Sequence, residues 1–307
     1  MPVAEHRGEE RGDARPKVLR VLDHNGPGKP ARPQLQAYVA RQYEQILAHD
    51  PGTRVGDEPE DLHDLRVAVR RLRAILKVSA PPLDKEWADD LRAELDWLGG
   101  ALGPVRDLDV MLADVRRAAS TLDEEERRAF APLLKRMERE RTARRRTMLS
   151  ALKSARYTAL LDRLEEAARR PRTRSARPSP DMVAAATFAQ LRNAVRKLDR
   201  DPSDRALHKV RIKSKRARYA AELAAPAHGK RVAKLIDCAK AFQDVTGAHR
   251  DAAVITARLR ELAAEAEPAA AFAAGRLAER QDARRQEARG AFDEAWRKLE
   301  RAAKRAW

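Results

Sequence analysis

The chain has 307 residues, enough to bury a sizeable core in one large domain or two smaller ones. Charged residues make up 36% of it and aromatic residues only 4%, and a composition dominated by Ala, Leu, Arg and Glu favours helices over strands. The formal net charge of +17 opposes compaction through self-repulsion, so it indicates an anionic partner such as nucleic acid, anionic lipid or polyphosphate.

Cysteine content and hydropathy indicate the cellular compartment of the protein. Cys238 is the only cysteine, so an intramolecular disulfide is excluded and a reducing cytoplasm fits. No stretch approaches the roughly 18 apolar residues of a membrane span, and the first residues lack the apolar core of a signal peptide. We therefore expect a cytoplasmic protein with no membrane partner.

In chain order, residues 1–33 are rich in Arg, Glu, Gly and Pro without apolar periodicity, which predicts a disordered tail. Residues 34–170 and 181–307 are helical in pattern, and the Pro- and Arg-rich residues 171–180 form the linker between them. Pro and Gly predict further breaks at residues 50–52, 81–82, 99–104 and 225–229. Each half then offers about four helices, which predicts an all-α fold of two four-helix bundles.

The two halves repeat each other. LHDLRVAVRRLR at residues 62–73 returns as LHKVRIKSKRAR at residues 207–218, 145 residues later. GPVRD at residues 103–107 returns as GAHRD at residues 247–251, 144 residues later. Two matches in the same order indicate a duplicated unit, and such units usually pack with pseudo-two-fold symmetry.

Each repeat carries a row of cations beside an apolar row. At 100° per residue, one set falls within about 80° of arc on its helix, and it comprises His63, Arg66, Arg70, Arg73 and Lys77. We call this set the first stripe. The equivalent second stripe comprises His208, Arg211, Lys215 and Arg218. Because arginines surround both histidines, we expect the two imidazoles to be biased toward their neutral form.

A run of charge is most often a solvated helix face, but such faces usually mix signs. Residues 205–221 contain seven Lys or Arg and no acid, and like charges at this spacing destabilise a free helix. A helix rising about 1.5 Å per residue spaces such cations by roughly 4.5 to 6 Å, which suits a linear polyanion. The arginine fork, in turn, suits phosphate oxygens.

Other polar residues of the repeat are weaker candidates. Asp107 and Asp251 either cap a helix that starts after a glycine turn, which we favour, or orient stripe arginines. Arg106 and Arg250 beside them either join the anion site or neutralise these acids. Two further arginines, on the first predicted helix of each half, are candidates for lining the same anion site: Arg41 and Arg192.

Catalytic and metal-binding patterns are missing. The chain lacks a phosphate-binding glycine loop, a His or Cys cluster with metal spacing, and a Ser, His, Asp grouping. We therefore expect a protein that is not an enzyme and needs no cofactor or metal.

These motifs resemble the CHAD family of α-helical domains, named for a conserved histidine that falls at His63. The segment at residues 98–107 looks like the second signature of the family, and the resemblance runs from about Gln34 to the C-terminus. It implies two four-helix bundles around a basic central channel, binding of inorganic polyphosphate, and association with polyphosphate granules and their proteins in bacteria. Lys215 and Thr246 depart mildly from the pattern. The chain looks like a stand-alone CHAD protein, since it lacks the Glu-x-Glu-x-Lys motif of a triphosphate tunnel domain.

Two other functions compete with polyphosphate binding. A nucleic-acid-binding protein would use the same net charge, but single-strand binders stack bases on aromatics, and Tyr219 is the one aromatic next to a stripe. A polyphosphate or triphosphate hydrolase would need an acid and metal constellation, which the sequence does not display. Chain-length preference, oligomeric state, the role of the tail and the choice between organising granules and recruiting proteins are not encoded in any pattern that we find.

Overall fold

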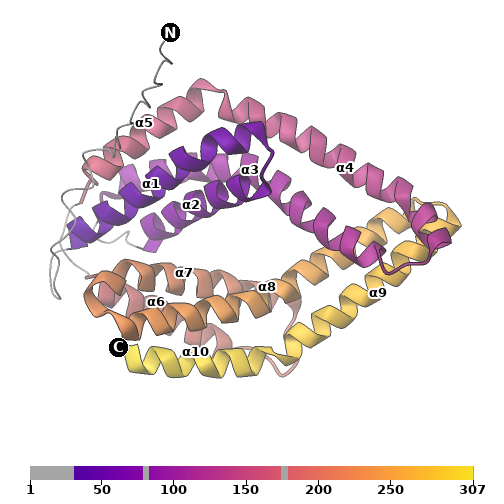
Figure 1. Ribbon diagram of the computed structural model, residues 1–307. Coiled ribbons are helices and arrows are strands. Elements are labelled where there is room, and N and C mark those ends of the chain that lie inside the picture. The colour runs from indigo at the N-terminus through magenta and orange to yellow at the C-terminus, as the bar shows by residue number, and fades with distance from the viewer. Residues whose placement is uncertain (1–30, 79–82, 174–178, 307) are drawn as a thin grey trace, which may run out of the picture.

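The computed structural model describes residues 31–78, 83–173 and 179–306 (Figure 1). The described residues are almost entirely helical, which confirms the all-α prediction, and Leu83 and Thr173 form a single isolated antiparallel bridge. The helices are α1 (Ala31–Val55), α2 (Pro59–Val78), α3 (Lys85–Ala119), α4 (Glu124–Leu152), α5 (Ala155–Arg169), α6 (Pro180–Arg196), α7 (Asp204–His228), α8 (Lys230–Ala264), α9 (Pro268–Gly290) and α10 (Phe292–Ala306).

Side-chain caps start most of the helices in the middle of the chain. Asp123 forms a capping box with Glu126, in which the Asp123 carboxylate accepts from the Glu126 amide at 2.8 Å. Ser154, Ser179 and Ser203 accept a hydrogen bond from the backbone at the starts of α5, α6 and α7. Each such cap stabilises its helix by about 1 kcal/mol, so local sequence sets these boundaries.

Two predicted breaks are wrong. Helix α1 continues through residues 50–52 to Val55, and α3 runs without interruption through residues 99–104 with Pro104 inside it. Glycine in a helix interior costs about 1 kcal/mol, but Leu95, Leu98 and Leu102 on the same helix are completely buried and hold this segment against the core. The break at residues 225–229 occurs at Gly229, which has a φ of +56° between α7 and α8. Residues 81–82 and 1–30 lie outside the described residues.

The helix order repeats, with five helices on each side of the linker instead of about four. Helices α3 and α8 are both 35 residues long, and α5 and α10 are both 15 residues long. The linker is described only at its ends. Its first residues are fixed beside the start of α3, where the Asp84 amide donates to the Arg172 carbonyl at 2.9 Å.

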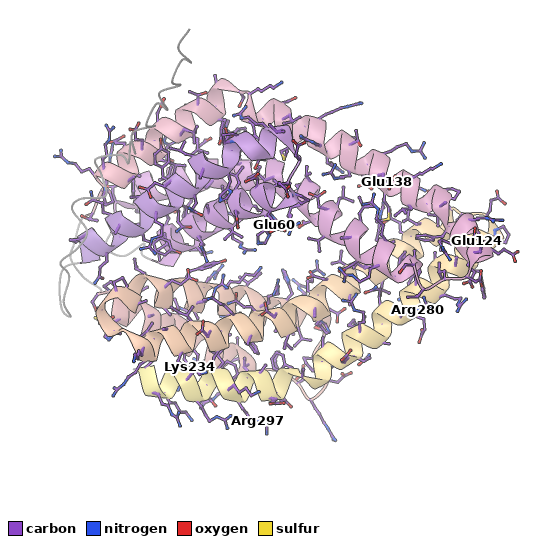
Figure 2. The ribbon with its side chains drawn as sticks, in the orientation of Figure 1. Glu60, Glu124, Glu138, Lys234, Arg280 and Arg297 are labelled. Atoms are coloured by element: carbon purple, nitrogen blue, oxygen red, sulfur yellow. The ribbon has the colours of Figure 1, made fainter. Side chains whose placement is uncertain are left out.

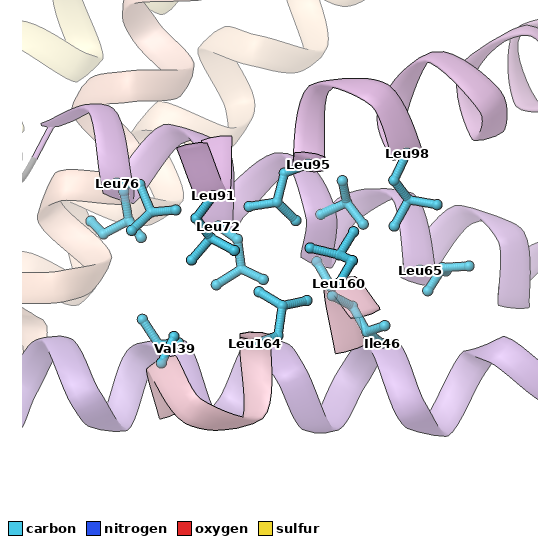
Figure 3. Packing of buried hydrophobic residues seen from close by; sticks show 14 of the residues in the cluster. Val39, Ile46, Leu65, Leu72, Leu76, Leu91, Leu95, Leu98, Leu160 and Leu164 are labelled. Carbon is cyan, nitrogen blue, oxygen red and sulfur yellow. The ribbon is translucent and has the colours of Figure 1, made fainter. Parts of the chain in front are cut away.

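Buried side chains form three main cores. The first core joins α1, α2, the first part of α3 and α5, and Figure 3 labels leucines of α2, α3 and α5 together with Val39 and Ile46 of α1. The second core joins α6, α7, the first part of α8 and α10, where Phe188 stacks on Trp296 with ring centroids 6.1 Å apart. The third core, which we call the distal bundle, joins the later parts of α3 and α8 with α4 and α9.

The distal bundle therefore combines helices from both halves, a feature that the repeat did not indicate. Leu112 of α3, Met137 of α4, Leu259 of α8 and Leu277 of α9 are all buried in it. In Figure 1 the two halves of the chain converge on this bundle at one end of the molecule. At the other end α2 and α7 lie opposite each other. The halves are thus joined at both ends, and both stripes are carried by the facing helices α2 and α7.

Candidate functional site

The first stripe lies on α2 beside the residues that pack into the first core. Leu62, Leu65, Val69 and Leu72 are buried. The first four stripe residues are half-buried and Lys77 is exposed. On α7, His208 is exposed and the other three members of the second stripe are half-buried. The cations therefore lie at the edge of the core, where partial loss of solvent strengthens their mutual electrostatic interaction.

Tyr219 of α7 connects the two stripes through one hydrogen bond and one cation–π contact. The Arg70 Nε donates to the hydroxyl of Tyr219 on α7 at 3.0 Å, and the Arg218 guanidinium lies 5.0 Å from the centroid of the same ring. Tyr219 is only 1% exposed. Its ring is therefore a buried support for two stripe arginines and offers no free face for stacking.

A single acid, Glu222, neutralises part of this surface. Its carboxylate lies 3.4 Å from Arg218 Nε and 3.6 Å from Arg71 Nε, and it accepts a hydrogen bond from the Tyr38 hydroxyl at 3.4 Å. Burial, followed by the charge of Glu222, raises the pKa of Tyr38 well above its usual value. Arg218 is thus held in a structural ion pair, which makes it less available to a ligand than its place in the stripe implies.

Lys215 lies where the cations of both halves converge. Burial, together with the charges of Arg70, Arg211 and Arg66 in that order, lowers the pKa of Lys215 from 10.5 to about 7. Burial also lowers the pKa of Arg211, with Asp251 opposing and Arg70 adding to the shift. Among the described residues no carboxylate forms an ion pair with Lys215 or Arg70. The two stripes therefore form one concentration of positive charge.

The capping role that we favoured for Asp107 and Asp251 is wrong, because both lie inside a long helix. Instead, Asp107 forms an ion pair with the Arg66 Nη2 at 2.9 Å. This contact matches the alternative role, in which the acid orients a stripe arginine. Asp251 acts electrostatically on Arg211. Enclosure by the protein raises the pKa of Asp251, and Arg211 opposes that shift.

The glycines of the two GxxRD segments lie under stripe arginines. A side chain at Gly247 would place its Cβ 2.9 Å from the Arg211 Nη1, and the same nitrogen donates to the Gln243 carbonyl at 2.5 Å. At Gly103 the corresponding distance to Arg66 is 3.9 Å. At Gly247 the missing side chain therefore lets Arg211 of α7 lie directly on the backbone of α8, whereas at Gly103 a Cβ would meet Arg66 at an ordinary contact distance.

Both histidines are biased toward the neutral form, as the arginines around them predict. Arg106 Nε donates to His63 Nδ1 at 3.3 Å, and its Nη2 lies 3.6 Å from Glu60. Figure 2 places Glu60 on the side of α2 that faces the second half. Burial first, and Arg106 next, lower the pKa of His63. Burial and then Arg250 lower the pKa of His208, so the two halves repeat this arrangement.

Some predicted residues lie apart from this cluster, and others were missed. Arg41 on α1 is exposed and Arg192 on α6 is half-buried, and neither bonds to a stripe residue within the described ranges. Arg73 forms an ion pair with Asp96.

Sequence reasoning missed Arg92 and Arg216. Arg216 is the largest cause of a lowered pKa at Lys77, ahead of desolvation and Arg92. Only Arg216 had a sequence signal, since it lies within the second repeat.

A hollow of about 310 Å³ adjoins the second stripe. Arg211, Gly247 and Asp251 line it from α7 and α8, while Asp114 of α3 and Arg284 of α9 complete it. The hollow thus draws on four helices and on both halves. In the described part of the chain, no helix is long and apolar enough to cross a membrane, and no group of three His, Cys, Asp or Glu residues has the geometry of a metal site.

The fold and the stripes together define an all-helical protein that concentrates cations on two facing helices. The CHAD domain model matches residues 37–260, and the chain belongs to the CHAD family. It is similar to PptA from Streptomyces chartreusis, with 26% identity, a TM-score of 0.74, and coverage of 88% of this chain and 100% of that one. The CHAD domain of the plant Ricinus communis is 27% identical, with a TM-score of 0.69 over 91% of this chain and 95% of that domain.

Curated relatives are longer than this chain. The uncharacterized proteins MT2285 and Rv2226 of Mycobacterium tuberculosis, from strains CDC 1551 and H37Rv, are each 31% identical over 304 residues. The match covers 92% of this chain but 56% of each relative, so the chain spans about half the length of the curated relatives that it matches. That the protein stands alone therefore stays a prediction.

Proposed function

We propose that this protein binds inorganic polyphosphate along the paired stripes of α2 and α7 and does not hydrolyse it. The observation that carries the proposal is the convergence of cations from both halves around Lys215, where burial first, and then the charges of Arg70, Arg211 and Arg66, lower its pKa to about 7. A free protein that holds like charges together loses stability, and a polyanion laid between the stripes reverses that cost. Membership of the CHAD family, which is linked to polyphosphate binding, supports the same ligand.

The chemistry of the stripes suits a linear phosphate chain. Arginine donates two parallel hydrogen bonds to phosphate oxygens, and its guanidinium stays charged at every physiological pH. Arg66 and Arg211 are held in position by Asp107 and by the Gln243 carbonyl, so their remaining donors are pre-oriented. Less conformational entropy is then lost on binding.

Nucleic acid is the weaker alternative. The aromatic residue next to the stripes, Tyr219, is buried and bonded to Arg70, so it offers no platform on which a base could stack. A competition assay decides between the two partners: labelled long-chain polyphosphate is displaced by unlabelled polyphosphate, RNA or duplex DNA at equal phosphate concentration and near-physiological salt. We expect polyphosphate to displace far more efficiently than either nucleic acid. Equal displacement by RNA would leave only general electrostatics.

The absence of catalysis is part of the proposal and needs its own test. Purified protein incubated with polyphosphate and Mg²⁺ or Mn²⁺ should release no orthophosphate, and stoichiometric turnover would overturn this part of the proposal. We further propose that binding takes place in the cytoplasm, at polyphosphate granules and among their proteins. A fluorescent fusion that stays diffuse in cells with stained granules would contradict that location.

A further inference from the structure

A second concentration of cations lies on the face of the second half formed by α8 and α10. There the first turns of α8 and the last turns of α10 line an open hollow of about 520 Å³, within the size range of ligand sites. We call it the outer groove. Six cations line it: Lys230, Arg231, Lys234, Lys298, Arg301 and Arg305. None of the described residues that line it is acidic, and its remaining wall is Cys238 and Ala302.

These cations are poorly neutralised by the protein. Lys298 pairs with Glu294 at 2.7 Å, but within the described residues the other five form no ion pair. Lys230 and Lys234 are four residues apart on α8, as are Arg301 and Arg305 on α10, and like charges at this spacing destabilise a helix. The groove therefore assembles repulsive pairs from two helices around one space.

The position of these cations on α8 makes the arrangement more costly. Lys230 and Arg231 lie in the first turn, where the positive end of the helix dipole disfavours cations. That turn holds no acidic residue, and the residue before it, Gly229, provides no side-chain cap. Of the six groove cations, Arg305 is the one that lies in a last turn, where a cation complements the helix dipole. Helix stability thus does not explain the cations of α8.

The first half carries opposite charge at the matching positions. At the 144-residue offset that aligns α3 with α8, Lys230 corresponds to Glu86 and Lys234 to Asp90. Cys238 corresponds to Glu94. Helix α3 thus has acids where α8 has Lys230 and Lys234, so the fold does not require positive charge at these two positions. The duplicated unit has diverged in charge while it kept its helices.

We propose that the outer groove is a second anion-binding site, distinct from the paired stripes, and that it takes a compact, multiply charged phosphate compound. Five cations without ion pairs around one hollow match several phosphate groups held close together. Inorganic oligophosphates and nucleoside triphosphates share this chemistry. The proposal does not depend on what the stripes bind.

Cys238 provides a direct readout, since it is the only cysteine of the chain and lines the groove. The test is the rate at which N-ethylmaleimide, an uncharged reagent, modifies Cys238 with and without tripolyphosphate or ATP. We expect either compound to slow the reaction, by about tenfold at ten times its Kd. Stronger protection by ATP would assign an organic group to the wall formed by Cys238 and Ala302. No protection by either at millimolar concentration overturns the site.

Two variants separate this site from its alternatives. Lys230→Glu with Lys234→Asp installs the charges of the first half, and it should fold with an unchanged or higher Tm because acids suit a first helical turn. It should lose the protection, whereas Arg144→Glu with Arg146→Asp on the exposed face of α4 makes the same change in charge and should keep it. Equal protection in both variants overturns the proposal. Arg66→Gln with Arg70→Gln should also keep it, which distinguishes the groove from the stripes.

Discussion

Arginines join the two halves at both ends of the molecule, but by opposite means. In the distal bundle they meet acids of the other half: Arg136 of α4 pairs with Glu265 after α8 at 2.7 Å, and Arg258 of α8 pairs with Glu140 of α4 at 2.5 Å. Between α2 and α7 one such pair, Arg71 with Glu222, is present, but the stripe cations also meet one another, with Arg66 and Arg70 of one half acting on Lys215 of the other.

The difference shows which part of the net charge the fold accounts for. Distal charges are balanced and lie over a core shared by both halves, so their role is assembly. In the stripes, Arg70 and Lys215 have no ion-pair partner among the described residues, and burial followed by neighbouring charges lowers the pKa of Lys215, so these cations oppose the same assembly. Residue type alone does not distinguish these roles, because both regions are rich in arginine.

The largest effect should come from the core of the distal bundle. Leu277→Ala removes a completely buried side chain from α9 and should lower the free energy of unfolding by about 2 to 5 kcal/mol. Chemical denaturation measures this loss. Polyphosphate affinity, measured where the variant is still folded, should stay close to wild type, since the stripes lie on α2 and α7. A large loss of affinity in the folded variant would show that the distal bundle sets the geometry of the stripes.

Neutralising the stripes should lower polyphosphate affinity and leave the protein folded. Arg66→Gln, Arg70→Gln and Lys215→Gln together remove three cations and, by analogy with single-stranded nucleic acid, should flatten the slope of log K against log salt by about 2. Affinity near physiological salt should fall on the order of 10- to 100-fold. Fluorescence titration across salt concentrations measures both quantities.

The control for the stripe variant removes the same charge from the distal bundle through Arg116→Gln, Arg136→Gln and Arg276→Gln. These arginines pair with Glu138, Glu265 and Glu126. The control should keep nearly the wild-type slope. If it loses as much affinity as the stripe variant, diffuse positive charge is sufficient for binding.

Affinity should depend on pH through Lys215. In the free protein its pKa is about 7, and a bound polyanion favours the ammonium form, so binding takes up a proton at pH values above 7. Affinity should therefore fall several-fold as pH rises from about 7 to 9. Lys215→Gln should remove this part of the profile. His63 and His208, whose pKa values are lowered, should contribute only below neutral pH, and the double His63→Ala, His208→Ala variant isolates their share.

The smallest effect should come from a single distal ion pair. Arg136→Gln breaks the partly exposed contact with Glu265 and should cost less than about 1 kcal/mol of stability. Thermal denaturation at low and high salt measures it, and the difference from wild type should shrink as salt screens the pair. A salt-independent loss would point to packing of the arginine stem instead of charge.

Periodicity and repetition determined the helices, the duplicated unit and the two stripes, because these depend on spacing along one helix. The 3.6-residue period places Arg66 and Arg70 on one edge whatever the rest of the molecule does. Capping serines likewise predict helix starts from local chemistry. The predicted break at residues 99–104 is wrong because glycine and proline weaken a helix locally, whereas burial of Leu98 and Leu102 against other helices stabilises it.

Only the tertiary structure decided which cations meet. Burial is the first cause of the lowered pKa of Lys215, and the next is Arg70, which lies 145 residues earlier in the chain. Arg92 likewise reaches Lys77 and Arg73 from another helix. Glu222 neutralises Arg218 within α7 but also Arg71 across the two halves. Coulombic interaction and desolvation depend on distance and enclosure in three dimensions, which a one-dimensional pattern does not contain.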